Sequence, residues 1–131
     1  MNTLRRGLYL VAALWTVAGL TLLFAPRFVV VSLFNQPVLD LAWPRLVGLN
    51  AFGLALIVVL VAQRAEELWW WSWAFALVAV GTAGVALLHA AFGLADGQSS
   101  VVWWVLGIGS AAVSLLLLSG LYVTARRYEA R

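Results

Sequence analysis

The stretch Trp43–Leu60, WPRLVGLNAFGLALIVVL, decides how the rest of the chain is interpreted. Pro44 stands at an expected first helical position, where the missing backbone N–H costs nothing. Arg45 and Asn50 follow on an otherwise apolar helix, although hydrocarbon disfavours both side chains. Three similar apolar stretches surround this one and leave little of the chain outside them. The pattern predicts helices that cross a membrane.

Composition supports the same interpretation. The chain has 131 residues, of which 65% are hydrophobic and 10% are charged, and its mean hydropathy is +1.01. A soluble domain is typically about 45–50% apolar and about a quarter charged. A membrane-spanning helix needs about 20 apolar residues, so four of them use most of the chain. We therefore expect a single transmembrane domain over residues 1–131 and no soluble catalytic domain.

The chain lacks the side chains that several kinds of chemistry require. It has no cysteine, which excludes disulfides, thiolate nucleophiles and cysteine-ligated metals, and it has one histidine. No nucleophile, base and orienting group can be assembled from its residues, so we expect no enzymatic activity and no catalytic residue. All eight basic residues are arginines. In a membrane protein such charge signals topology first, and we expect no nucleic-acid partner.

The sequence predicts an all-α fold, an integral membrane four-helix bundle. The expected helices cover residues 7–24, 44–62, 68–94 and 101–123. Residues 27–35 predict a short interfacial helix between the first two, because an unpaired strand in lipid would leave its backbone groups unsatisfied. The apolar run at residues 7–25 is longer than a usual signal-peptide core, so we interpret it as a retained first helix.

The arginines predict the orientation. With four spans, both termini share one side with the loop at residues 63–67. That side carries Arg5, Arg6, Arg64, Arg126, Arg127 and Arg131, whereas the other carries Arg27 and Arg45. Positive charge is enriched on cytoplasmic loops. We therefore expect a multi-pass protein of the cell membrane, a bacterial inner membrane, with cytoplasmic N- and C-termini.

Tryptophans and small residues mark the surfaces of the predicted spans. Tryptophans cluster where the third span begins, as in a headgroup-level aromatic belt: Trp69, Trp70, Trp71 and Trp73. The fourth span starts with Trp103 and Trp104. Small residues recur at helical spacing, which lets helix backbones approach in lipid. The clearest series is Ala79, Ala83, Ala86 and Ala90, with Gly81 and Gly84 beside it, and the second span has Gly48 and Gly53.

Three residues outside the tails are candidates for ligand binding: Arg45, Asn50 and His89. Arg45 suits an interfacial anchor, a headgroup clamp or a partner for Asp40 or Asp96. We expect Asn50 to face the bundle interior, either for an interhelical hydrogen bond or for a ligand carbonyl. A neutral His89 suits a hydrogen bond to a quinone, or axial ligation of a haem or other tetrapyrrole, although a histidine near a helix end is more often simply interfacial. We expect no other metal site.

The segments LLFAPRF and RLVGLNAFGLALIVV, with Arg45, Gly48 and Gly53, resemble the first half of the DoxX-like four-helix bacterial membrane proteins. The resemblance covers about half of the chain and does not extend to the tryptophan-rich second half. It implies a four-helix bundle that often serves as an accessory membrane component without one agreed activity.

These features favour a small non-catalytic protein that acts as an accessory or structural subunit of a larger membrane complex. Its partners would be other membrane subunits or copies of itself within the lipid bilayer. The alternative is a binder of a small lipophilic ligand (a quinone, pigment or lipid) in an outward-facing pocket between the second and third helices. A homo-oligomeric channel or transporter ranks below both, because pores usually carry polar rings or mid-membrane charges.

Overall fold

The computed structural model describes residues 2–37, 40–93 and 100–131. Within these ranges it contains no strand. Four helical spans in them are long and apolar enough to cross a membrane: Asn2–Phe24 (α1), Ala42–Gln63 (α2), Ala65–Gly93 and Val101–Glu129 (α5). The prediction of an all-α four-helix bundle is confirmed, and the spans indicate a multi-pass membrane protein.

The third span is not one regular helix. It consists of α3 (Ala65–Leu68), the 3-10 turn η2 (Trp69–Trp71), α4 (Ser72–Leu88) and the π-helix η3 (His89–Gly93). A second π-helix, η1 (Phe28–Leu33), lies in the connection between α1 and α2. Its ladder continues to Phe34, whose N–H donates to the Val29 carbonyl at 3.0 Å. The short helix expected at residues 27–35 is present, but it has the wider π-helical turn.

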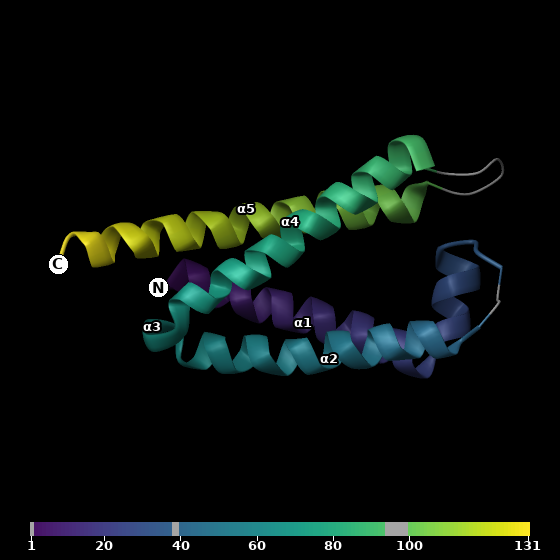
Figure 1. Cartoon of the computed structure of the whole chain (residues 1–131), viewed down its shortest axis with the longest axis horizontal. Helices are drawn as coiled ribbons and strands as arrows, with labels where there is room; N and C mark the ends of the chain where they lie inside the picture. Colours follow the sequence, from purple (N-terminus) through teal and green to yellow (C-terminus); the bar gives the residue numbers. More distant parts are fainter. Residues whose placement is uncertain (1, 38–39, 94–99) are drawn as a thin grey trace.

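Consecutive spans form two helical hairpins. α1 packs along α2 and α4 packs along α5, while α1 also contacts α5 and so joins the hairpins. Both termini and α3 lie at one end of the molecule (Figure 1). We call it the basic end, because it carries Arg5, Arg6, Arg64, Arg126, Arg127 and Arg131. At the opposite end, the η1 end, the hairpins diverge and η1 rises from the first toward the second (Figure 1).

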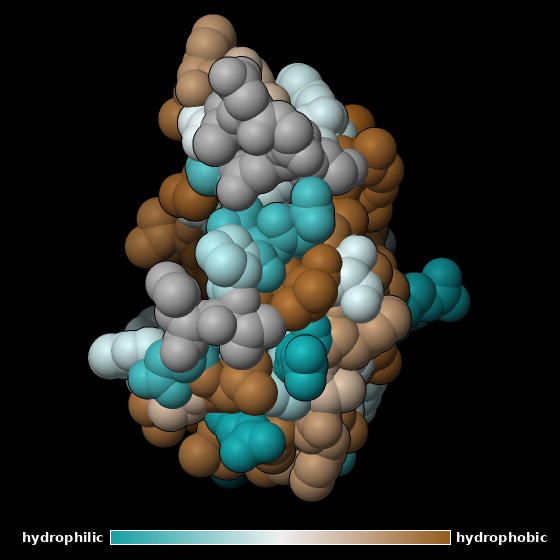
Figure 2. Space-filling model, turned by 90° about the vertical axis from the view of Figure 1, so that its right-hand side faces the viewer, coloured by the Kyte–Doolittle hydropathy of each residue, from teal (hydrophilic) through white to brown (hydrophobic). Residues whose placement is uncertain are grey.

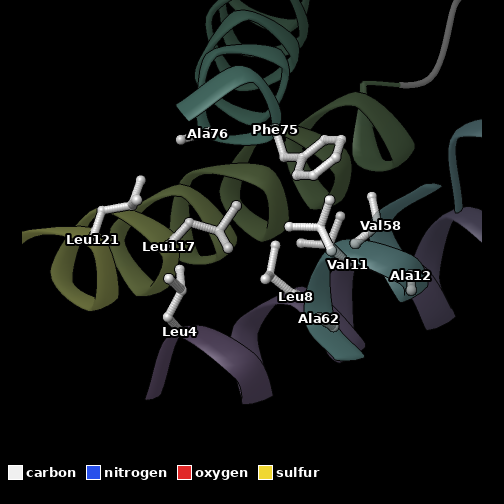
Figure 3. Close-up of a cluster of buried hydrophobic side chains, with 11 residues drawn as sticks. Leu4, Leu8, Val11, Ala12, Val58, Ala62, Phe75, Ala76, Leu117 and Leu121 are labelled. Atoms are coloured by element: carbon white, nitrogen blue, oxygen red, sulfur yellow. The ribbon is translucent and has the colours of Figure 1, made fainter. Parts of the chain in front are cut away.

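The core shared by all four spans lies toward the basic end. Figure 3 shows side chains from α1, α2, α4 and α5 meeting there. The cluster contains Leu4, Leu8, Val11, Ala12, Val58, Val61, Ala62, Phe75, Ala76, Leu117 and Leu121. Phe75 also meets Trp15 of α1 edge-on, with ring centroids 6.3 Å apart. No member of this cluster comes from the half of any span nearest the η1 end.

Each hairpin is held together by small residues. In the first, a Cβ built on Gly19 would lie 2.7 Å from the Gly48 carbonyl oxygen, and one on Gly48 would lie 2.6 Å from that of Gly19. Only glycine permits this approach of the two backbones. In the second hairpin the alanine series predicted from its spacing is buried: Ala79, Ala83, Ala86 and Ala90.

The first and last spans are longer than predicted. α1 begins at Asn2 rather than at residue 7, because Leu4 is fully buried and lies against Gly120 of α5. α5 continues beyond residue 123 to Glu129. Thr124 is buried in this added part, and its hydroxyl donates to the Gly120 carbonyl at 2.8 Å. Packing between the chain ends therefore extends both helices into the charged tails.

The inner boundaries also differ from the prediction. α2 begins at Ala42, so Pro44 is the third helical residue rather than the first, and the Asp40 carboxylate accepts the Ala42 N–H at 2.9 Å. The third span begins at Ala65 instead of residue 68. Arg64 and Glu67 form a salt bridge there. The predicted end of this span at residue 94 lies outside the described residues.

Candidate functional site

Three rings meet at the η1 end and form what we call the aromatic cluster: Phe34, His89 and Trp103. Trp103, the third residue of α5, is the central member. Phe34 meets it edge-on, with ring centroids 4.9 Å apart. The His89 imidazole lies on it with centroids 4.4 Å apart and planes inclined by 58°. The cluster thus links the connection between α1 and α2 to the second hairpin.

The backbone on either side of Phe34 positions its ring. Asn35 has φ of 51°, in the left-handed region that asparagine tolerates better than most side chains. Such a residue ends a helix in the manner of a glycine cap. η1 therefore stops just before Phe34, whose ring contacts α5.

His89 is positioned by the second π-helical segment, of which it is the first residue. A Cβ built on Gly93 would lie 2.6 Å from the imidazole Nδ1. The ring therefore lies directly against the backbone of residue 93, a position that a larger residue would disturb. π-helical turns occur often at functional sites, and here two of them contribute to one cluster.

The polar atom of Trp103 has no partner. Its indole Nε1 is buried and forms no hydrogen bond within the described part of the chain. A buried tryptophan N–H usually finds an acceptor. Leaving such a group unpaired costs about 1–3 kcal/mol. The cluster therefore contains a hydrogen-bond donor that no described residue of the chain satisfies.

Two hollows lined by described residues meet at Trp103. The η1 hollow has a volume of about 350 Å³ and is lined by Leu22, Val29, Val30, Phe34, Gln36, Trp43, Pro44, Val47 and Trp103. The α4 hollow measures about 390 Å³ and is lined by Val78, Gly81, Thr82, Val85, Ala86, Trp103 and Leu106. Both linings are predominantly apolar. Figure 2 shows this end of the molecule, where hydrophilic residues gather between apolar flanks.

The structure corrects the predicted placement of Asn50. The side chain is exposed, and its amide donates to the Leu46 carbonyl one turn earlier at 2.8 Å. The amide thus finds an acceptor within its own helix while the side chain is exposed, so the expectation that Asn50 faces the bundle interior is wrong. The pocket expected between the second and third spans stays a prediction. α2 packs along α1 and α4 packs along α5, and the two hairpins diverge toward the η1 end (Figure 1).

Arg45 is exposed in the first turn of α2. It forms no salt bridge with a carboxylate of the described residues. Asp40, one of its proposed partners, accepts a backbone N–H of α2 instead, and Asp96 lies outside the described residues. The roles of Arg45 as an anchor or a headgroup clamp stay predictions.

Of the three candidate residues, the structure brings only His89 into the aromatic cluster. Phe34 and Trp103 were not among the site residues predicted from the sequence. A tryptophan near a helix end, such as Trp103, is typical of the membrane interface. Its distinguishing property, a missing hydrogen-bond partner, depends on contacts between distant segments that periodicity does not reveal.

The described residues provide no observation that favours a metal site or a channel. They contain no group of three or more histidine, aspartate or glutamate side chains that could hold a metal ion. Axial ligation of a tetrapyrrole by His89 stays a prediction. The hydroxyls of Thr16, Thr82 and Ser114 donate to carbonyls of their own helices, at 2.7, 2.8 and 2.7 Å.

No protein-family model matches the chain, and no curated protein or solved structure shows significant similarity to it. The resemblance to DoxX-like proteins therefore stays a prediction that rests on the residues quoted for it. The function has to be argued from the geometry of this chain.

Proposed function

We propose that the protein binds a lipophilic molecule with a hydrogen-bond acceptor, such as a lipid or a quinone, at the η1 end. The observation that carries the proposal is the unpaired indole N–H of Trp103, a residue that lines both the η1 hollow and the α4 hollow. An acceptor oxygen on a ligand would satisfy this donor.

The η1 hollow has the composition of a site for such a molecule. Small-molecule sites are mostly apolar and carry a few polar groups that fix orientation. Here apolar side chains of α1, η1 and α2 supply the walls and the surface of the hollow is apolar, so the polar group that would fix orientation is the Trp103 N–H behind that surface. Because Nε1 is buried, an acceptor reaches it only after the atoms that cover it move. Binding should therefore change the environment of the Trp103 indole.

Trp103→Phe tests the role of the indole N–H. The substitution keeps an aromatic ring against Phe34 and His89 but removes the donor, so ligand affinity should fall about tenfold, the equivalent of one hydrogen bond. The purified protein would be titrated with a benzoquinone carrying a decyl tail, and binding would be followed by quenching of tryptophan fluorescence. An organic extract and a visible spectrum of the untreated protein would identify any ligand that co-purifies.

Trp104→Phe is the matched control, because Trp104 is the next residue on α5, is 41% exposed and lines neither hollow. This variant should bind the quinone as the unmodified protein does. Equal affinities of the two variants would contradict the proposal, as would a protein that binds no quinone and yields no extractable ligand.

A second candidate is the accessory-subunit function, which specific open faces favour. A Cβ added to Gly53, Gly81, Gly84 or Gly109 would meet no atom within 4 Å. Such glycines offer close approach to another helix in lipid, either from a second copy or from another membrane subunit. Mild detergent extraction should then give a complex larger than one chain, which Gly84→Leu disrupts and Val80→Leu does not. A monodisperse monomer would contradict this function.

We also propose that the basic end faces the cytoplasm of a bacterial inner membrane. The support is the distribution of arginines, six of which lie at that end. Since the chain has no cysteine, a single cysteine introduced at Glu129 can be probed cleanly. It should resist an impermeant thiol reagent in intact cells and react after lysis.

A further inference from the structure

A third hollow, of about 300 Å³, lies at the basic end, where α3 meets the last turns of α5. Its lining consists of Glu66, Thr124, Arg127, Tyr128 and Arg131. None of these residues takes part in the aromatic cluster. We propose that this hollow, which we call the headgroup site, binds the phosphodiester headgroup of a phospholipid.

One wall of the headgroup site is held in place by contacts between distant parts of the chain. The Tyr128 ring stacks on Trp69, with centroids 5.4 Å apart and planes inclined by 12°. Its hydroxyl donates to the Glu66 backbone carbonyl at 2.8 Å. These contacts fix the end of α5 against α3, so the hollow is a defined part of the fold rather than a frayed tail.

Two arginines of the lining have no anionic partner in the part of the chain that the structure describes. Arg127 lies in the last turn of α5 and Arg131 lies just beyond its end, and both line the hollow. Among the described residues the ion pair found is Arg64–Glu67, so neither arginine forms a salt bridge. Arg126 differs, because its guanidinium lies over the Tyr122 ring, 4.8 Å from the centroid, and does not line the hollow. Planar guanidinium groups suit phosphate oxygens, which they bind in a bidentate manner.

The depth of the headgroup site matches a lipid phosphate. α5 has 29 residues, which corresponds to about 44 Å of helix against a hydrocarbon thickness of about 30 Å. Its charged last turns therefore extend into the headgroup region. Just before them, Tyr122 and Val123 are exposed and offer an apolar surface for acyl chains. A lipid can use both the arginines and this surface, whereas a free phosphate can use only the arginines.

Glu66 indicates which headgroup fits. Glu66 lines the same hollow, where its carboxylate would repel a purely anionic ligand. It would accept hydrogen bonds from the hydroxyls of a glycerol headgroup, whereas choline has no N–H or O–H to donate. The site should therefore prefer phosphatidylglycerol to phosphatidylcholine.

The test is native mass spectrometry of the full chain in detergent with phosphatidylglycerol or phosphatidylcholine added. Phosphatidylglycerol should bind the unmodified protein more tightly, and Arg127→Gln should weaken it about tenfold, as expected for loss of a charge-assisted hydrogen bond. Arg126→Gln removes the same charge from the same end but not from the hollow, so it should change binding little. Glu66→Gln should reduce the preference between the two lipids.

If Arg127→Gln and Arg126→Gln reduced the affinity for phosphatidylglycerol equally, the proposal would be overturned, because net charge alone would then explain binding. Equal binding of the two lipids to the unmodified protein would overturn it as well. Displacement of phosphatidylglycerol by millimolar inorganic phosphate would assign the site to free phosphate instead. Arg131→Gln provides a second variant that cannot disturb the fold through a helix, since Arg131 follows the end of α5; it too should weaken phosphatidylglycerol binding.

Discussion

Gly48→Ala is expected to lower the free energy of unfolding by about 2 kcal/mol, a typical cost of overpacking. The added Cβ would lie 2.6 Å from the Gly19 carbonyl oxygen and 2.8 Å from the backbone nitrogen of Leu23. Backbone atoms cannot rotate away as the end of a side chain can. α1 and α2 would therefore have to separate along their contact, and much of the packing in the first hairpin would be lost.

The matched control is Gly53→Ala on the same helix, where an added Cβ meets no atom within 4 Å. It should leave stability unchanged or raise it by up to about 1 kcal/mol, because alanine favours helix more than glycine does. Reversible unfolding in mixed detergent micelles, followed by circular dichroism, measures both variants. If the two alanines had equal effects, close contact at Gly48 would not be what holds the hairpin.

Leu117→Ala should destabilise the protein by about 2 to 3 kcal/mol, toward the lower part of the range for leucine-to-alanine substitutions in cores. Leu117 is fully buried in the core shared by the four spans, and one of its methyl groups lies 3.3 Å from a Cβ built on Gly7. In a bilayer the apolar transfer energy is small, since lipid is as apolar as leucine. The lower free energy of unfolding therefore reflects mainly the packing contacts that disappear when a cavity forms.

Leu115→Ala is the control for this substitution, because Leu115 is 70% exposed on the same helix. Lipid can fill the space that the shortened side chain leaves, so stability should change by less than about 0.5 kcal/mol. The same unfolding assay compares the two variants. If both substitutions lowered the free energy of unfolding by similar amounts, α5 would contribute to stability through its helical backbone and not through the shared core.

The number and approximate extent of the spans were predictable because hydropathy and length determine what can cross a membrane. The buried face of the third span was predictable as well, since the spacing of Ala79, Ala83, Ala86 and Ala90 marks a surface for close approach. The ends of α1 and α5 were not predictable from hydropathy, because contacts such as that between Leu4 and Gly120 extend them into charged sequence.

Most of the candidate site could not be predicted from the sequence. In lipid almost every face of these helices is apolar, so patterning does not say which helix lies beside which. The placement of Asn50 was predicted wrongly, because its amide can donate to a carbonyl one turn back in its own helix and does not have to face another helix for that bond. His89 could be predicted as a candidate because of its chemistry. Trp103 is recognised as a site residue only from its contacts with Phe34 and His89 in the structure.

The position of the shared core has a consequence for the order of events during synthesis. Each hairpin joins neighbouring spans and can assemble as soon as its own two helices are in the membrane. The core needs Leu4 and Leu8 from the beginning of the chain and Leu117 and Leu121 from near its end. Until the last helix leaves the ribosome, those early leucines face lipid or a chaperone. The nascent protein therefore exists first as an independent hairpin and becomes one folded unit only when translation is nearly complete.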